Sequence, residues 1–189
     1  MKHALKLIVA TLFFTLTISA QALELKGVKI DETAQVGGSA LVLNGAGVRT
    51  KLMFKVYVAG LYLTQKQVDA NAVINDTGNK RVSMHFLREL SAEKLLHGMN
   101  EGFEDNNSVA EMTAIDAQMK AFRQMMASAK AVKEGDVIVL DLTSTGTQVS
   151  LNGKTLGNIE GAGFNQALLR VWLGAQPVDA ALKKSMLGQ

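Results

Sequence analysis

The stretch from Leu52 to Leu63 constrains the fold more than any other part of the chain. It is rich in β-branched and aromatic residues, among them Val56, Tyr57 and Val58, and this composition is typical of a strand. Because apolar residues lie on both sides of the alternation, the pattern predicts a long strand that is buried on both faces over most of its length. Lys55 is the exception, since a lysine inside such a strand requires a wet cleft or a sheet edge.

Other segments predict further strands and turns. Leu23–Ile30 and Arg81–Leu90 alternate with the two-residue period of a strand, and Val137–Leu142 is a short apolar run that also predicts a strand. Gly37-Gly38 marks a turn. The glycines within Asn44–Gly47 permit a tight or bulged backbone.

After Ser91, the spacing of apolar residues changes from the two-residue period of a strand to that of a helix. Ser91 itself is suited to cap a helix. Two helices are expected from there, separated by the polar segment Asn106–Ser108. The first carries Leu95, Leu96, Met99 and Phe103, and the second carries Met112, Ile115, Met119, Phe122 and Met126. The second stripe is the strongest helix signal in the chain, and its methionines suit either a core or the wall of an apolar pocket.

The C-terminal part combines a hairpin with two more helices. Asn152-Gly153 is the dipeptide best suited to a two-residue hairpin turn. A helix that carries Phe164 and Trp172 is expected to end at Gly174, and Asp179 can cap a final short helix. Strands and helices are therefore segregated along the chain, which favours a single α+β domain with a mostly antiparallel sheet.

Residues 1–22 have the three parts of a secretory signal peptide. A basic start is followed by an uncharged run from Leu7, and Ala20 and Ala22 supply the small residues of a cleavage site. The uncharged run is shorter than the roughly 20 residues that a membrane span needs. We therefore expect cleavage after Ala22 and a periplasmic domain of residues 23–189, with an uncleaved N-terminal anchor as the alternative.

The net charge of +3 comes mostly from this leader. Removal of Lys2 and Lys6 reduces the 20 basic residues to 18, against 17 acidic residues, so the balance falls to +1. That balance removes the case for nucleic-acid binding, which needs a basic stripe. The absence of cysteine excludes disulfides, thiolate metal sites and a cysteine nucleophile. His85 and His97 have no partners at metal-ligand spacing, so we predict neither a metal nor a cofactor.

Arg49 is the most informative polar residue, because it stands between a glycine-rich turn and the long apolar strand. A guanidinium close to a buried strand must find water, an acid or a ligand, since it does not lose its proton. Its fork of donors suits a carboxylate or an enolate-like oxyanion, and the alternative is an ion-pair or capping role.

The surroundings of Arg49 resemble the chalcone isomerase family. The family has a stretch that reads close to GAGVR, and Gly45–Arg49 is similar to it. A strand that ends G-[VL]-Y-L follows in the family, and Gly60–Leu63 resembles that end. Phe164–Gly174 and Pro177–Asp179 resemble its penultimate helix, glycine and closing helix. The resemblance spans Leu23–Gln189 and is closest to the exported bacterial branch. It implies an open-faced β-sandwich, in which helices back a large antiparallel sheet and an apolar cleft lies between them.

The resemblance also implies a site. In plant isomerases the matching arginine steadies a phenolate oxygen, and in fatty-acid-binding members it holds a carboxylate, which makes Arg49 the head of the site. Pairing Lys55 with the family's lysine places Tyr57 where plant enzymes have a threonine, so both residues become candidate ligand contacts. Asn100 or Asn106 could stand for the family's asparagine, whereas its tyrosine has no placed counterpart.

Three functions remain open at this point. The first is a periplasmic module that binds a small amphipathic anion, a fatty acid or an aromatic acid, between Arg49, Tyr57 and an apolar cleft. The second is an isomerase that closes a ring by adding an oxyanion to an enone, with Arg49 and Tyr57 as catalytic residues. The third is an envelope structural protein with a vestigial cleft. We favour binding, because a fold does not determine a reaction and binding demands only an apolar cleft with a few polar groups.

Overall fold

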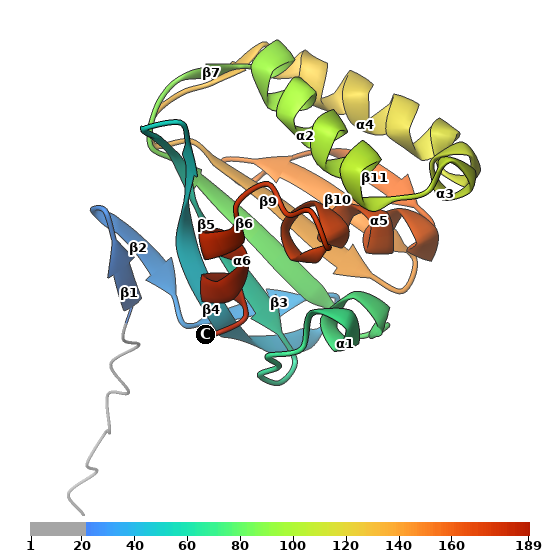
Figure 1. The fold of residues 1–189 in the computed structure, drawn as a ribbon. Helices are drawn as coiled ribbons and strands as arrows, with labels where there is room; N and C mark the ends of the chain where they lie inside the picture. The colour runs from blue at the N-terminus through green and yellow to red at the C-terminus, as the bar shows by residue number, and fades with distance from the viewer. Residues whose placement is uncertain (1–21) are drawn as a thin grey trace, which may run out of the picture.

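The computed structural model describes residues 22–189, so the predicted leader lies outside the described residues apart from Ala22. The centre of the fold is one seven-stranded antiparallel sheet with the order β11-β10-β9-β6-β5-β4-β3 (Figure 1). Its strands are β3 (Thr33–Val36), β4 (Ser39–Lys51), β5 (Phe54–Leu63), β6 (Lys80–Phe86), β9 (Val137–Thr143), β10 (Gly146–Leu151) and β11 (Lys154–Glu160).

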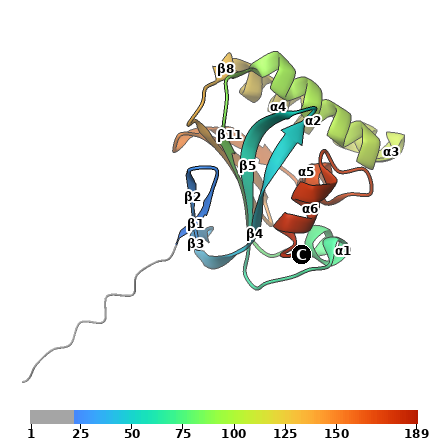
Figure 2. The same cartoon turned by 60° about the vertical axis from the view of Figure 1, so that its left-hand side comes forward.

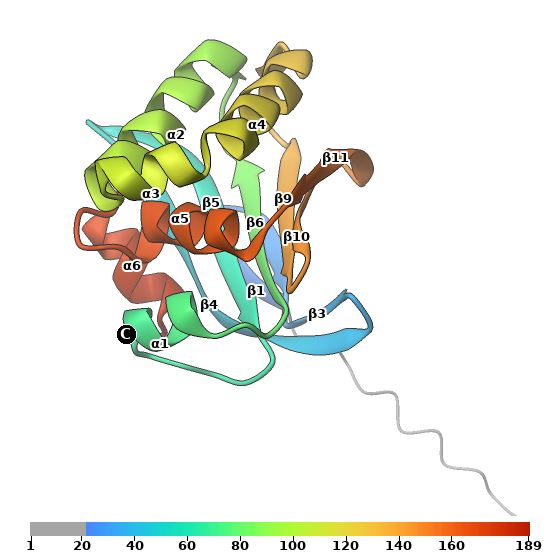
Figure 3. The same cartoon turned by 90° about the vertical axis from the view of Figure 1, so that its right-hand side faces the viewer.

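The helices gather on one face of this sheet, as the side view in Figure 3 shows. They are α1 (Ala70–Asn75), α2 (Ala92–Asn106), α3 (Val109–Ala114), α4 (Asp116–Ser128), α5 (Ala162–Leu173) and α6 (Ala180–Met186). The main core fills the layer between helices and sheet and includes Trp172, Phe103 and Phe122. This arrangement confirms the predicted α+β class, with a large antiparallel sheet backed by helices. No helix within residues 22–189 has the length and apolar content to cross a membrane.

The other face of the sheet is partly covered by a small hairpin of β1 (Ala22–Leu25) and β2 (Val28–Asp31), visible in Figure 2 on the side opposite to the helices. The prediction of a single strand over Leu23–Ile30 was wrong. The chain reverses at Lys26 and Gly27, whose φ angles of 54° and 78° are those of a tight hairpin turn. Alternation alone does not reveal such a reversal, because the pattern continues in phase on both sides of the turn.

The predicted long strand is confirmed as β5, which is buried from Val56 to Leu63. It pairs with β4 on one side and with β6 on the other, and core residues cover both of its faces. Leu52 and Met53 belong to the turn that joins β4 to β5 rather than to the strand. The predicted irregularity before Arg49 is also confirmed, since the β4–β5 register shifts between Leu43 and Gly45.

Glycines of this region have a second role that the sequence does not reveal. A Cβ atom on Gly45 would overlap the backbone oxygen of Ser185, and one on Gly47 would lie 2.7 Å from the Ser185 side chain. Helix α6 therefore lies directly on the backbone of β4. Asn44 secures the contact by donating a hydrogen bond to the Met186 carbonyl over 2.8 Å.

The helical region differs from the expectation in two respects. The methionine stripe is divided into α3 and α4 by Ile115, although Ile115, Met119 and Phe122 all face the core as predicted. The period reports which face is buried and not whether the backbone is continuous. Helix α1 was not predicted, because its six residues are too few for a periodic signal, and Asp69 caps it. The short strand β7 (Leu90–Ser91) precedes α2, and the short strand β8 (Ala131–Val132) follows α4. The two strands pair in antiparallel fashion.

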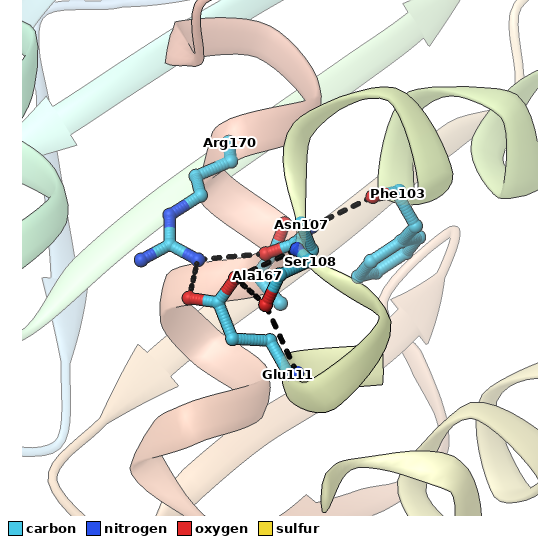
Figure 4. A network of polar contacts seen from close by, with 6 residues as sticks. All are labelled: Phe103, Asn107, Ser108, Glu111, Ala167 and Arg170. Atoms are coloured by element: carbon cyan, nitrogen blue, oxygen red, sulfur yellow. Dashed lines mark hydrogen bonds and ion pairs between the residues drawn. The ribbon is translucent and has the colours of Figure 1, made fainter. Parts of the chain in front are cut away.

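A polar network joins α5 to the corner between α2 and α3 (Figure 4). One terminal nitrogen of Arg170 donates to Asn107 over 2.7 Å and to Glu111 over 2.8 Å. Glu111 also accepts from the backbone and hydroxyl of Ser108, which completes a capping box at the start of α3. The donation by the Ser108 backbone and hydroxyl, together with Arg170, lowers the pKa of Glu111 from 4.5 to about 2.

Because the pKa of Glu111 is depressed in the folded state, its contribution to stability is complete above pH 4.5 and is lost as the pH falls toward 2. We expect Glu111→Gln to remove this part of the pH dependence of the urea midpoint between pH 4.5 and about 2. Glu104→Gln, on the exposed surface of α2, is the matched control and should keep the wild-type profile. Identical profiles for wild type and Glu111→Gln would contradict the prediction.

Candidate functional site

Arg49 lies in β4 directly opposite Tyr57 of β5, next to a second register shift between Arg49 and Thr50. Its side chain reaches the helical layer, and the residue is only 8% exposed. Gly98 of α2 lies over the guanidinium, and a Cβ atom there would be 3.4 Å from one terminal nitrogen, which is an ordinary contact. Helix α2 therefore covers Arg49 from the side of the helical layer.

The Arg49 guanidinium has no acidic partner within residues 22–189. Its Nε atom is buried without a hydrogen-bond partner, and no carboxylate lies within ion-pair distance. The carboxylate of Asp179 is occupied elsewhere, because it accepts from the Thr50 backbone and caps α6. An unpaired charge in such a place costs stability, so the site holds a positive charge that an anion would compensate.

Tyr57 is the neighbour that the sequence analysis expected beside Arg49, and the structure brings the two together. The guanidinium carbon of Arg49 lies 5.5 Å from the centre of the Tyr57 ring, within the range of a cation–π contact. The Tyr57 hydroxyl accepts a hydrogen bond from Nε1 of Trp172 over 2.9 Å. Burial raises the pKa of Tyr57 above 10, although Arg49 and Trp172 partly oppose the shift. The phenol is therefore protonated at neutral pH and retains a proton to donate.

A cavity of about 380 Å³ opens beside Arg49. Its lining comes from the end of β4, from α2 and from the loop before α6, and consists of Arg49, Lys51, Gly98, Glu101, Gly102, Asp105, Gln176, Pro177 and Val178. Lys51 and Glu101 form an exposed ion pair of 3.5 Å there. The space next to Arg49 is thus mainly polar. The apolar cleft expected at Arg49 is not open in this structure, because buried side chains such as Tyr57, Trp172 and Met99 fill the layer between helices and sheet.

Of the five predicted ligand contacts, Arg49 alone lines this cavity, and Tyr57 is buried in the adjacent core. Lys55 is exposed near the β4–β5 turn. Asn100 accepts a hydrogen bond from Nε of Arg123, which links α2 to α4. Asn106 donates to the carbonyls of Gly102 and Gln176 and accepts from the Gln176 backbone, so its amide holds the loop before α6 against α2.

Three residues of the site, Trp172, Gly98 and Gly102, were not predicted from the sequence. Gly98 and Gly102 are four residues apart in a predicted helix, which places them on one face, and that spacing could have indicated a close contact. Trp172 was placed in the core, but nothing in its local sequence identifies Tyr57, 115 positions away, as its hydrogen-bond partner.

Comparisons with known proteins agree with this architecture. A family model described as chalcone isomerase-like matches residues 22–188. No curated protein matches the chain in sequence. Among solved structures, a fatty-acid binding protein of Arabidopsis thaliana is similar, with a TM-score of 0.65 and 14% identity over 88% of this chain and 96% of that one. At this identity the likeness concerns the fold.

Proposed function

The chain belongs to the chalcone isomerase-like family, and on that basis we propose that it binds a small amphipathic anion of the fatty-acid type through Arg49. The observation that carries the proposal is the buried guanidinium, which has no carboxylate partner within residues 22–189. A carboxylate ligand would accept its donors in the forked geometry that arginine favours and would neutralise the buried charge. The solved structure with a similar fold is itself a fatty-acid binding protein.

Tyr57 supplies the second polar group in this proposal. Its hydroxyl already accepts from Trp172, which orients the oxygen and leaves the phenolic proton for a ligand oxygen. The head of the ligand would thus lie between a fixed cation and one neutral donor. Sites for amphipathic ligands are commonly built from a few converging polar groups above apolar surface.

The apolar tail would enter the layer between α2 and the sheet. Met99 follows Gly98 on α2 and is buried, and Met84 of β6 belongs to the same core. Methionine side chains have three rotatable bonds and can rearrange around a guest more readily than branched ones. We propose that the tail displaces these side chains, because they fill the apolar layer.

We propose that this binding takes place in the periplasm, after removal of residues 1–22. The tripartite pattern of that segment supports export. The absence of cysteine suits an oxidising compartment.

One preparation tests both parts of the proposal. Native mass spectrometry of the protein from the periplasm of its host should show a chain that begins at Leu23 and carries a bound acid. Titration of the emptied protein should show saturable binding of dodecanoate and at least about tenfold weaker binding of dodecanol, which has the same tail and no charge.

Other outcomes assign other functions. Turnover of a chalcone that is lost with Arg49→Met would favour the isomerase, in which the guanidinium stabilises an oxyanion. Equal affinity for dodecanoate and dodecanol would contradict an anion site at Arg49. Absence of both binding and turnover would leave the structural role as the better explanation.

A further inference from the structure

The turn between β4 and β5 presents three large apolar side chains to solvent. Leu52 and Met53 are each 89% exposed, and the adjacent Phe54 is 55% exposed. Figure 1 shows this hairpin projecting beyond the sheet at the end nearest β7. We call Leu52, Met53 and Phe54 the hairpin tip. Contiguous apolar side chains at such exposure indicate a surface that is covered in use.

The backbone of the tip gives no reason for these residues. Leu52 has a φ of 58°, a left-handed conformation that costs a branched side chain about 1 kcal/mol or more. Three other two-residue turns within residues 22–189, Lys26-Gly27, Gly37-Gly38 and Asn152-Gly153, have a positive φ at both positions, with a polar residue or glycine first and glycine second. Among these turns of residues 22–189, the β4–β5 turn alone combines a positive φ at a non-glycine residue with two apolar side chains. Turn formation therefore does not explain why Leu52 and Met53 are apolar.

Cationic side chains surround the tip. Lys55 and Arg88 are exposed and have no carboxylate within ion-pair distance among residues 22–189. Lys51, in contrast, forms an ion pair with Glu101. The guanidinium carbon of Arg88 lies 4.6 Å from the centre of the Phe54 ring, which groups charge and apolar surface in one place. The exposed acid next to Arg88 is Glu89.

We propose that the hairpin tip inserts into the surface of an anionic phospholipid bilayer. Leu52, Met53 and Phe54 would lie below the headgroups, and Lys55 and Arg88 would bind the lipid phosphates. A bilayer accepts a narrow apolar projection without a complementary pocket. A stable protein partner would have to bury about 800 Å² on each side, far more than one turn of this size provides.

Docking in this manner would bring the candidate site to the membrane. Lys51 adjoins the tip and also lines the cavity beside Arg49. An amphipathic anion could then move between the bilayer and the cavity without crossing open water. The docking inference itself does not rest on the proposed ligand, because vesicle binding is measured without it.

The test is flotation of the protein, expressed with its own leader and purified from the soluble fraction, with vesicles of equal parts phosphatidylglycerol and phosphatidylethanolamine. The double variant Leu52→Asn, Met53→Ser should reduce vesicle binding by at least about tenfold, since two apolar anchors are lost. Asparagine tolerates a positive φ, so this variant keeps or improves the turn. Lys55→Gln should reduce binding about fivefold on these vesicles and have no effect on phosphatidylcholine vesicles.

Two matched variants serve as controls. Val109→Ser removes an apolar side chain of similar exposure, 85%, from α3 instead of the tip. Lys66→Gln removes an exposed charge beyond the opposite end of β5. Both should bind vesicles like the wild type. Equal flotation of the wild type and the tip double variant would overturn the inference, as would concentration-dependent dimerisation that only the double variant loses.

Discussion

Replacement of Arg49 by methionine is expected to weaken dodecanoate binding strongly and to stabilise the protein in the absence of dodecanoate. Loss of a buried charge-assisted pair with a carboxylate costs about 2–5 kcal/mol, which weakens the affinity at least about 30-fold. In the absence of ligand, methionine preserves most of the side-chain volume and removes a buried charge that lacks an acidic partner. We therefore expect a gain of ~1–2 kcal/mol in the free energy of unfolding.

Arg170→Met is the matched control, because the same substitution there removes a guanidinium that is paired. Arg170 donates to Asn107 and Glu111, and its loss leaves the buried Asn107 oxygen without that donor. This variant should lose stability in the same urea titration while it retains dodecanoate binding. If Arg49→Met is destabilised as strongly as Arg170→Met, Arg49 has a structural role and the binding proposal is wrong.

Replacement of Gly45 by alanine is expected to produce the second large effect, a loss of about 2–4 kcal/mol in the free energy of unfolding. The added Cβ atom would overlap the Ser185 carbonyl oxygen and lie 3.0 Å from two further backbone atoms of the α6 end. Because backbone atoms cannot move aside as a flexible side chain can, α6 must shift away from β4. Urea unfolding followed by circular dichroism measures this loss.

Gly163→Ala provides the comparison for the same chemical change. A Cβ atom at Gly163, in α5, would meet Ile115 at 3.8 Å, which is an ordinary contact. Alanine is a better helix former than glycine, so this variant should be neutral or more stable by up to about 1 kcal/mol. Wild-type stability of Gly45→Ala would show that α6 does not lie directly on β4.

Arg49→Met and Gly45→Ala probe neighbouring parts of one arrangement. Asp179 caps α6 and accepts a hydrogen bond from Thr50, the residue after Arg49. Displacement of α6 by Gly45→Ala should therefore disturb the backbone that carries Arg49. The glycine and arginine parts of the GAGVR segment then have separate roles, one in seating a helix and the other in the candidate site.

Local chemistry explains what the sequence determined by itself. The two-sided apolar run of β5, the turn at Asn152-Gly153 and the caps Ser91 and Asp179 act over a few residues, so each is visible in a short window. The α+β class followed from the order of these elements, and the resemblance around Arg49 identified the family.

Only the tertiary structure decided which polar groups are free. Asn106 is an asparagine, the residue type that the resemblance requires at the site. Its amide is bound instead to the backbone of Gln176, 70 positions away. Arg49 remains without an acid because Asp179, on the helix that closes over β4, binds the backbone of Thr50 instead. Such contacts depend on which distant elements the fold brings together. No local pattern could therefore show that Arg49 is buried and unpaired, or that Gly45 makes room for helix α6.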